Sequence, residues 1–92
     1  MSRFLIEVPH EANETACVKA IQAFLRTGSH FLTHADWGCK DGEHKAWIIV
    51  DVDEREEARA IVPHNYRANA KVTKLNYFTM KEIESLKGYH QG

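Results

Sequence analysis

The most informative pattern in the chain is the stretch SHFLTHADWGCKDGEHKAWIIVDV, residues 29–52. Its second half, residues 45–52, is strongly apolar and rich in β-branched side chains, which predicts a strand. Residues 29–38 repeat with a period of two, which predicts another strand. Because Asp41 and Gly42 between them are a turn signal, the stretch predicts an antiparallel hairpin.

A turn centred on Asp41 and Gly42 also predicts which residues face each other across the hairpin. One face is apolar and is expected to lie under helices, with the pairs Phe31–Val52, Thr33–Val50, Ala35–Ile48 and Trp37–Ala46. The other face pairs Asp36 with Trp47 and His34 with Ile49, so it mixes polar and large apolar groups.

The rest of the chain predicts two further strands and three helices. They are a strand at residues 3–8, a helix capped by Asn13 and ended by Gly28, a helix from Asp53 to Pro63, a strand at residues 71–78, and a helix capped by Thr79 with Glu82. This order in 92 residues predicts one α+β domain over residues 1–92. The expected type is the ferredoxin-like βαββαβ fold, an antiparallel sheet with two helices on one face, plus a short C-terminal helix.

Composition excludes several classes of function. The formal net charge is −1 and the basic residues are scattered, which argues against nucleic-acid binding. No stretch approaches the roughly 18 apolar residues of a membrane span, and the chain begins in a strand pattern rather than a signal peptide. We therefore expect a cytoplasmic protein in which Cys17 and Cys39 are free thiols, and in which His64, His90 and residues 88–92 are solvated.

Two helices cover only one face of a sheet. Leu5, Leu32, Trp47 and Ile49 would then form an exposed apolar patch on the other face, which soluble monomers rarely carry. The simplest solution is a homodimer that packs sheet against sheet, with the terminal helix available to reach across. The alternative is that the terminal helix folds back over the face of its own chain.

The polar residues of this open face are the candidate ligand-binding site. They are Glu7, His34, Asp36, Trp47 and Asp51. In a cavity between two sheets, carboxylates and an imidazole would have shifted pKa values suited to proton transfer. The alternative interpretation is that these groups only satisfy one another at an interface.

The six histidines also raise the possibility of a transition-metal site. Cys39 lies opposite His44 in the predicted hairpin, with Cβ atoms about 5 Å apart, which suits either two ligands on one metal or a thiol activated by an imidazole. His30 and His34 would be roughly 13 Å apart along a strand, too far to share an ion. A stable zinc site needs four ligands, so a purely structural role for the hairpin pair stays open.

A family resemblance extends over most of the chain, in four short stretches. They are residues 4–8 (FLIEV), 28–31 (GSHF), 35–37 (ADW) and 78–79 (FT). In these stretches the chain resembles small bacterial proteins of unknown function with a dimeric ferredoxin-like or α/β-barrel build, some described as nickel-binding. The resemblance implies dimerisation, and it implies that the recurrent histidines of that group correspond to His10 and His30.

Three hypotheses about function follow. The first is a homodimer that binds a small ligand or a metal ion, nickel or zinc, at the open sheet face, with His10, His30, Cys39 and His44 as the metal candidates. The second is an isomerase or monooxygenase of dimeric α/β-barrel build, using His34 or His30 with Asp36 as acid and base. The third is a protein-interaction module.

Overall fold

The computed structural model describes residues 1–86, which form an antiparallel sheet and several helices. The strands are β1 (Ser2–Pro9), β2 (Asp36–Trp37), β3 (Lys45–Val52) and β4 (Lys71–Leu75). The helices are α1 (Glu14–Arg26), α2 (His30–Thr33), α3 (Arg55–Ile61), α4 (His64–Arg67) and α5 (Met80–Leu86), and a 3-10 turn spans Cys39–Asp41. The expected solvated tail at residues 88–92 lies outside the described residues.

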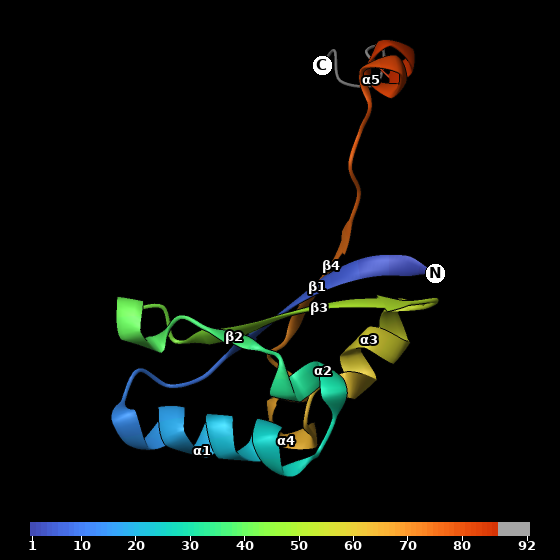
Figure 1. The fold of residues 1–92 in the computed structure, drawn as a ribbon. Helices are drawn as coiled ribbons and strands as arrows, with labels where there is room; N and C mark the ends of the chain where they lie inside the picture. Colours follow the sequence, from blue (N-terminus) through green and yellow to red (C-terminus); the bar gives the residue numbers. More distant parts are fainter. Residues whose placement is uncertain (87–92) are drawn as a thin grey trace.

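The sheet has the strand order β2-β3-β1-β4, and every neighbouring pair is antiparallel. Helices α1 to α4 lie on one side of it, and α5 stands off on the other side (Figure 1). The predicted α+β class with an antiparallel sheet is therefore confirmed. Within residues 1–86, no helix combines the length and the apolar character that a membrane crossing needs.

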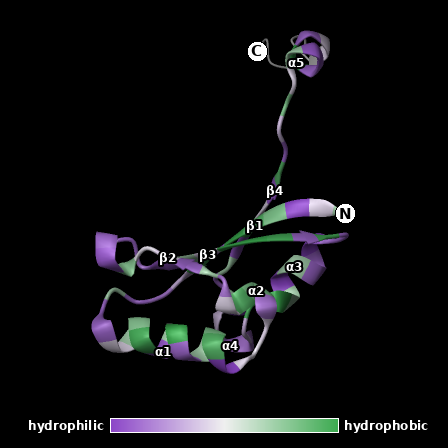
Figure 2. Ribbon diagram, viewed as in Figure 1, coloured by the Kyte–Doolittle hydropathy of each residue, from purple (hydrophilic) through white to green (hydrophobic). Residues whose placement is uncertain are grey.

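The core lies between the sheet and the helix layer. Strand β1 turns Phe4, Ile6 and Val8 toward the helices, and all three are buried. Their cross-strand partners on β3 carry the same alternation, so the green hydrophobic segments of the two strands run together in Figure 2. The helices complete this core with Phe24, Leu32, Ala58 and Val62.

Helix α1 begins and ends as the sequence predicts. The side-chain oxygen of Asn13 accepts the N–H of Ala16 at 2.8 Å, which satisfies one of the free donors at the helix start. After Arg26 the chain passes through Thr27 to Gly28, whose φ of +70° is a left-handed conformation that favours glycine.

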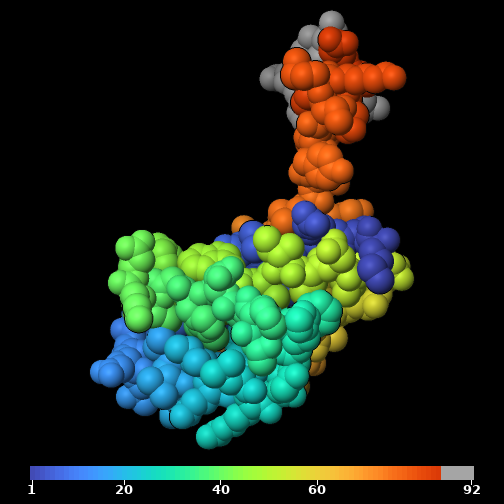
Figure 3. All heavy atoms as spheres, viewed as in Figure 1, coloured from blue at the N-terminus to red at the C-terminus, as the bar shows by residue number. Residues whose placement is uncertain are grey.

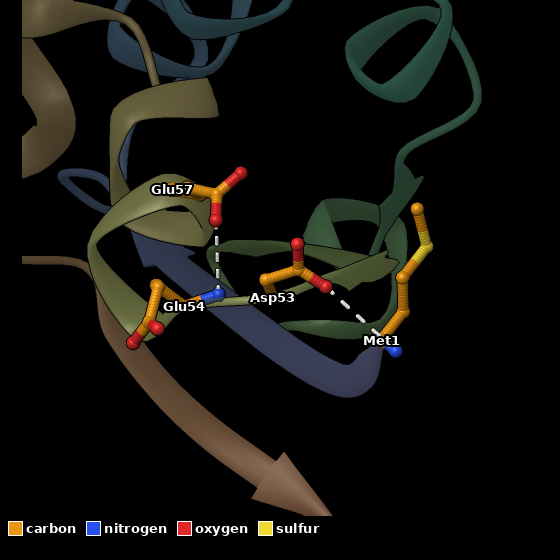
Figure 4. A network of polar contacts seen from close by, with 4 residues as sticks. All are labelled: Met1, Asp53, Glu54 and Glu57. Atoms are coloured by element: carbon orange, nitrogen blue, oxygen red, sulfur yellow. Dashed lines mark hydrogen bonds and ion pairs between the residues drawn. The ribbon is translucent and has the colours of Figure 1, made fainter.

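Helix α3 begins one residue later than predicted, because Glu54 and not Asp53 is its N-cap. The carboxylate of Glu57 accepts the backbone N–H of Glu54 at 3.1 Å, forming a capping box (Figure 4). Asp53 lies instead 3.7 Å from the amino group of Met1. The helix ends before Pro63, as expected.

The predicted strand at residues 29–38 was wrong over most of its length. Residues 30–33 form α2, whose Leu32 is buried in the core rather than exposed on the open face. Thr33 donates its backbone N–H to the carbonyl of Ser29 and Ala35 donates to that of Leu32, so these groups are satisfied without a strand partner. The prediction was wrong because one helical turn followed by a two-residue strand gives the same alternation of apolar and polar residues as a single short strand.

The hairpin register itself is confirmed where the strand exists. Asp36 pairs with Trp47 and Trp37 with Ala46, and β3 has the predicted bounds. The pairs predicted for Phe31, Thr33 and Ala35 do not form, because those residues lie in or beside α2.

The C-terminal part departs from the prediction in two places. Strand β4 ends at Leu75, whereas the sequence predicted a strand to residue 78. Helix α4 was not predicted. The cap at Thr79 is confirmed, since its hydroxyl accepts the N–H of Glu82 at 3.2 Å and α5 follows.

Candidate metal centre

Two histidines lie side by side where β1 ends and β3 begins. His10 follows β1 and His44 precedes β3, and the backbone N–H of His10 donates to the carbonyl of His44 at 3.0 Å. Along each strand, both positions share the parity of the buried residues, such as Val8 and Ala46. Both imidazoles therefore belong to the helix side of the sheet and not to its open face.

Two cysteines from different elements lie close to these histidines. Cys39 opens the 3-10 turn of the hairpin, which ends at Gly42 with a φ of +83°. The turn is tied to β3 because Gly38 donates its N–H to the carbonyl of Lys45 at 3.1 Å. Cys17 lies in the first turn of α1, where its N–H donates to the carbonyl of Asn13 at 3.0 Å.

These side chains bring nitrogen and sulfur atoms within ligand distance of one another. One ligand atom each from His10, Cys39 and His44 lies within 4.8 Å of the other two. The Nε2 of His10 is 3.1 Å from the Sγ of Cys39, and the Sγ of Cys17 is 2.8 Å from the same sulfur. Around a tetrahedral zinc ion, with bonds of about 2.1–2.3 Å, neighbouring ligand atoms are about 3.5–3.8 Å apart. His10, Cys39 and His44 therefore fit one ion after shifts of about 1 Å, and Cys17 contacts the group through the sulfur of Cys39.

The hydrogen bonds of the histidines suit metal binding. The Nδ1 of His10 is 2.9 Å from the carbonyl of Glu11, which can only accept, so Nδ1 carries the proton and Nε2 presents its lone pair to Cys39. This arrangement is the usual support for a histidine ligand. The Nδ1 of His44 is buried and has no hydrogen-bond partner among the described residues. A buried polar atom of this kind is costly unless something binds it.

The thiol of Cys39 is held in its protonated form. Partial burial raises its pKa from 9.0 to about 11, and the neighbouring Cys17 raises it in the same direction. Both cysteines are free thiols in this structure. A bound cation would reverse this preference, because a metal ion stabilises the thiolate that coordinates it.

Comparison with known proteins gives no family for this chain. No protein-family model, curated protein or solved structure matches it. The case for any function therefore depends on the residues of this chain.

Of the metal candidates from the sequence, His30 lies elsewhere. It sits on α2 with His34, and the two ring centroids are 4.4 Å apart instead of the roughly 13 Å expected on a strand. The Nδ1 of His34 donates to the carbonyl of His30 at 2.8 Å, one helical turn back. The two rings line a hollow of about 250 Å³ together with Asp51, and Asp36 is not part of its lining.

Three of the open-face candidates form one row across the sheet. Asp36, Trp47 and Glu7 are successive cross-strand partners on β2, β3 and β1. The indole N–H of Trp47 donates to the carboxylate of Glu7 at 3.3 Å. Asp51 is further along β3 and faces Arg3, whose Nε lies 3.5 Å from its carboxylate. His34 caps the end of α2 and lines the separate hollow with Asp51, so it is not part of the row of Asp36, Trp47 and Glu7.

Sequence reasoning missed Cys17 as a member of the cluster. In the sequence it was expected only to be a free thiol. The usable signal was its place in the first helical turn after His10, on the face turned to the sheet. That signal identifies Cys17 as a ligand candidate only once the start of α1 is known to pack against the hairpin.

Proposed function

We propose that this chain is a transition-metal-binding domain whose ligands are His10, Cys17, Cys39 and His44. The single observation that supports it best is the convergence of two imidazoles and two thiols from three separate segments. The buried Nδ1 of His44 has no hydrogen-bond partner within residues 1–86, and an ion would give it one.

Zinc is the metal that this ligand set favours. Two sulfurs and two nitrogens in a tetrahedral arrangement are typical of zinc, whereas nickel(II) prefers square-planar or tetragonal nitrogen and oxygen sites. Four protein ligands leave no position for a substrate, so the proposed role of the ion is structural. It would fasten the start of α1 and the hairpin turn to the end of β1.

The proposal also includes a ferredoxin-like fold and a homodimer. The strand order β2-β3-β1-β4 with helices on one face supports a ferredoxin-like arrangement, even though the second strand has only two residues. The open face, where Ile49 is 60% exposed beside the half-buried Leu5 and Trp47, supports a homodimer.

The test is metal titration of the reduced, metal-free protein, with a chromophoric chelator as competitor. We expect one zinc ion per chain, and a cobalt(II) spectrum with the bands of tetrahedral thiolate coordination. Cys17→Ala, Cys39→Ala, His10→Ala and His44→Ala should each weaken zinc binding on the order of 100-fold or more.

His30→Ala is the matched control, because it removes a histidine that lies outside the cluster. Its zinc affinity should equal that of the wild type. Wild-type zinc binding no tighter than that of Cys39→Ala would refute the proposal, and a loss of affinity in the His30 variant would move the site to α2.

A further inference from the structure

The C-terminal arm, residues 76–86, projects away from the rest of the described chain. After β4 the chain runs away from the sheet to α5, which stands clear of the body in Figures 1 and 3. The Cα radius of gyration is 16.0 Å, against about 12 Å for a compact domain of this length. The arm therefore makes few contacts that could hold it in place.

The arm nevertheless carries a concentration of apolar side chains. Tyr77, Phe78, Met80 and Ile83 are 85%, 53%, 76% and 44% exposed. Met80 and Ile83 are three residues apart on α5 and share one face of the helix. A helix of 7 residues is not stable alone in water, so α5 needs a surface to pack on.

An apolar surface is available on the open side of the sheet. Leu5 and Ile49 are cross-strand neighbours there, with Trp47 beside them on β3. At the root of the arm a hollow of about 700 Å³ is lined by Ile49, Leu75 and Tyr77, with charged groups such as Arg3, Asp51 and Lys74 around them. This open face and the arm have complementary apolar character.

The direction of the arm points to another copy of the chain and not to its own sheet. β4 is an edge strand, and folding back would need a reverse turn directly after it. Residues 75–86 contain no glycine or proline, and the one turn-forming residue directly after β4, Asn76, is followed by Tyr77, Phe78 and Thr79, which favour an extended backbone. The four-residue segment 76–79 spans up to about 14 Å when extended, enough to reach a second body.

We propose that residues 76–86 of each chain lie across the open sheet face of a second copy, in a reciprocal twofold exchange. This inference rests on the homodimer proposed above and names the segment that forms it. Aromatic side chains bury about 150–250 Å² each, so two exchanged arms and the faces they cover exceed the roughly 1,000 Å² that a stable interface needs.

The test compares full-length variants in sedimentation equilibrium, with circular dichroism to verify folding. Phe78→Asp in the arm and Ile49→Asp on the open face should each weaken the dimer by at least about 30-fold. Leu25→Asp is the matched control, because Leu25 is 54% exposed but belongs to α1 on the other side of the molecule. It should leave the dimer unchanged.

Photocross-linking identifies the chain that supplies the arm. Ile49 is replaced by photoreactive benzoylphenylalanine, and this protein is mixed with heavy-isotope-labelled wild type. We expect cross-links from position 49 to the labelled arm peptide. Cross-links only within one chain, or a dimer unaffected by Phe78→Asp, would overturn the exchange while leaving the homodimer standing. A wild type that is monomeric at about 100 μM would overturn both.

Discussion

At the scale of single residues, Cys39 is the centre of the cluster, because both His10 and Cys17 contact its sulfur. Its ionisation therefore links the site to stability. In the folded, metal-free protein its pKa is about 11, raised mainly by burial, whereas an unperturbed thiol has a pKa of 9.0. The raised pKa means that the fold favours the thiol over the thiolate.

The first prediction concerns alkaline pH. Between pH 9 and pH 11 the unfolded chain releases the Cys39 proton while the folded chain keeps it. The unfolded state then binds fewer protons, so the free energy of unfolding falls as the pH rises through this window. Denaturant titrations of the metal-free protein at several pH values should show this loss.

The matched variant for this measurement is Cys39→Ser, whose hydroxyl does not titrate in this range. Lysines and tyrosines also titrate there, so the relevant quantity is the difference in pH slope between the two proteins. A steeper decline in the wild type is expected. Parallel curves would mean that Cys39 does not ionise differently in the folded and unfolded states.

The candidate site was predictable from sequence only as far as local pairing extends. The turn at Asp41 and Gly42 was sufficient to place Cys39 near His44, because facing positions in a hairpin follow from its register. Cys17 could not be assigned, since its approach to Cys39 depends on how α1 packs over the end of the sheet. Such packing is set by the core as a whole and not by any short motif.

At the scale of elements, the hairpin turn holds Cys39 and His44 through Gly38. A Cβ added at Gly38 would lie 2.6 Å from the ring of Trp47 and 2.7 Å from the carbonyl oxygen of Glu43. Neither neighbour can yield easily, because one is a ring packed on the sheet and the other is backbone. The turn depends on this close approach.

Gly38→Ala should therefore destabilise the domain by about 1–3 kcal/mol, the usual cost of overpacking. It should also weaken zinc binding, because a displaced turn moves Cys39 away from its partners. Thermal denaturation and chelator competition measure the two effects.

Gly28→Ala separates these effects from a general loss of stability. A Cβ at Gly28 meets nothing within 4 Å, and only its φ of +70° opposes the substitution. We expect a loss of about 1 kcal/mol with unchanged zinc affinity. Equal effects of the two alanine variants on zinc affinity would show that the turn does not position the site.

The elements themselves differed in how well the sequence predicted them. β3 and the start of α1 were correct because a long apolar strand and an Asn cap are strong local signals. The prediction for residues 29–38 was wrong because their local sequence suits a strand and a helical turn equally well, and packing decided between the two. Burying Leu32 in a helical turn over the core was favoured over extending an edge strand.

At the scale of the whole molecule, the proposed ion and the exchanged arm act on opposite sides of the sheet. His10 and His44 share the strand parity of the buried residues on the helix side, and Cys17 lies on α1. The arm leaves toward the open side of the sheet (Figure 1). Ion binding should therefore stabilise the fold without requiring the dimer. The two proposals can fail independently.

The last prediction is the response of the whole domain to metal removal. An ion that binds only the folded state adds RT ln(1 + [Zn²⁺]/Kd) to the free energy of unfolding, about 2.7 kcal/mol when free zinc is 100 times Kd. For a domain of this size that raises Tm by about 10–20 °C, and a chelator should reverse the rise. Cys39→Ala should gain none of it, whereas Phe78→Asp should gain all of it when each variant is compared with its own metal-free form. A Tm of the wild type that zinc does not change, or one that rises equally in Cys39→Ala, would show that these four side chains do not bind the ion as a unit.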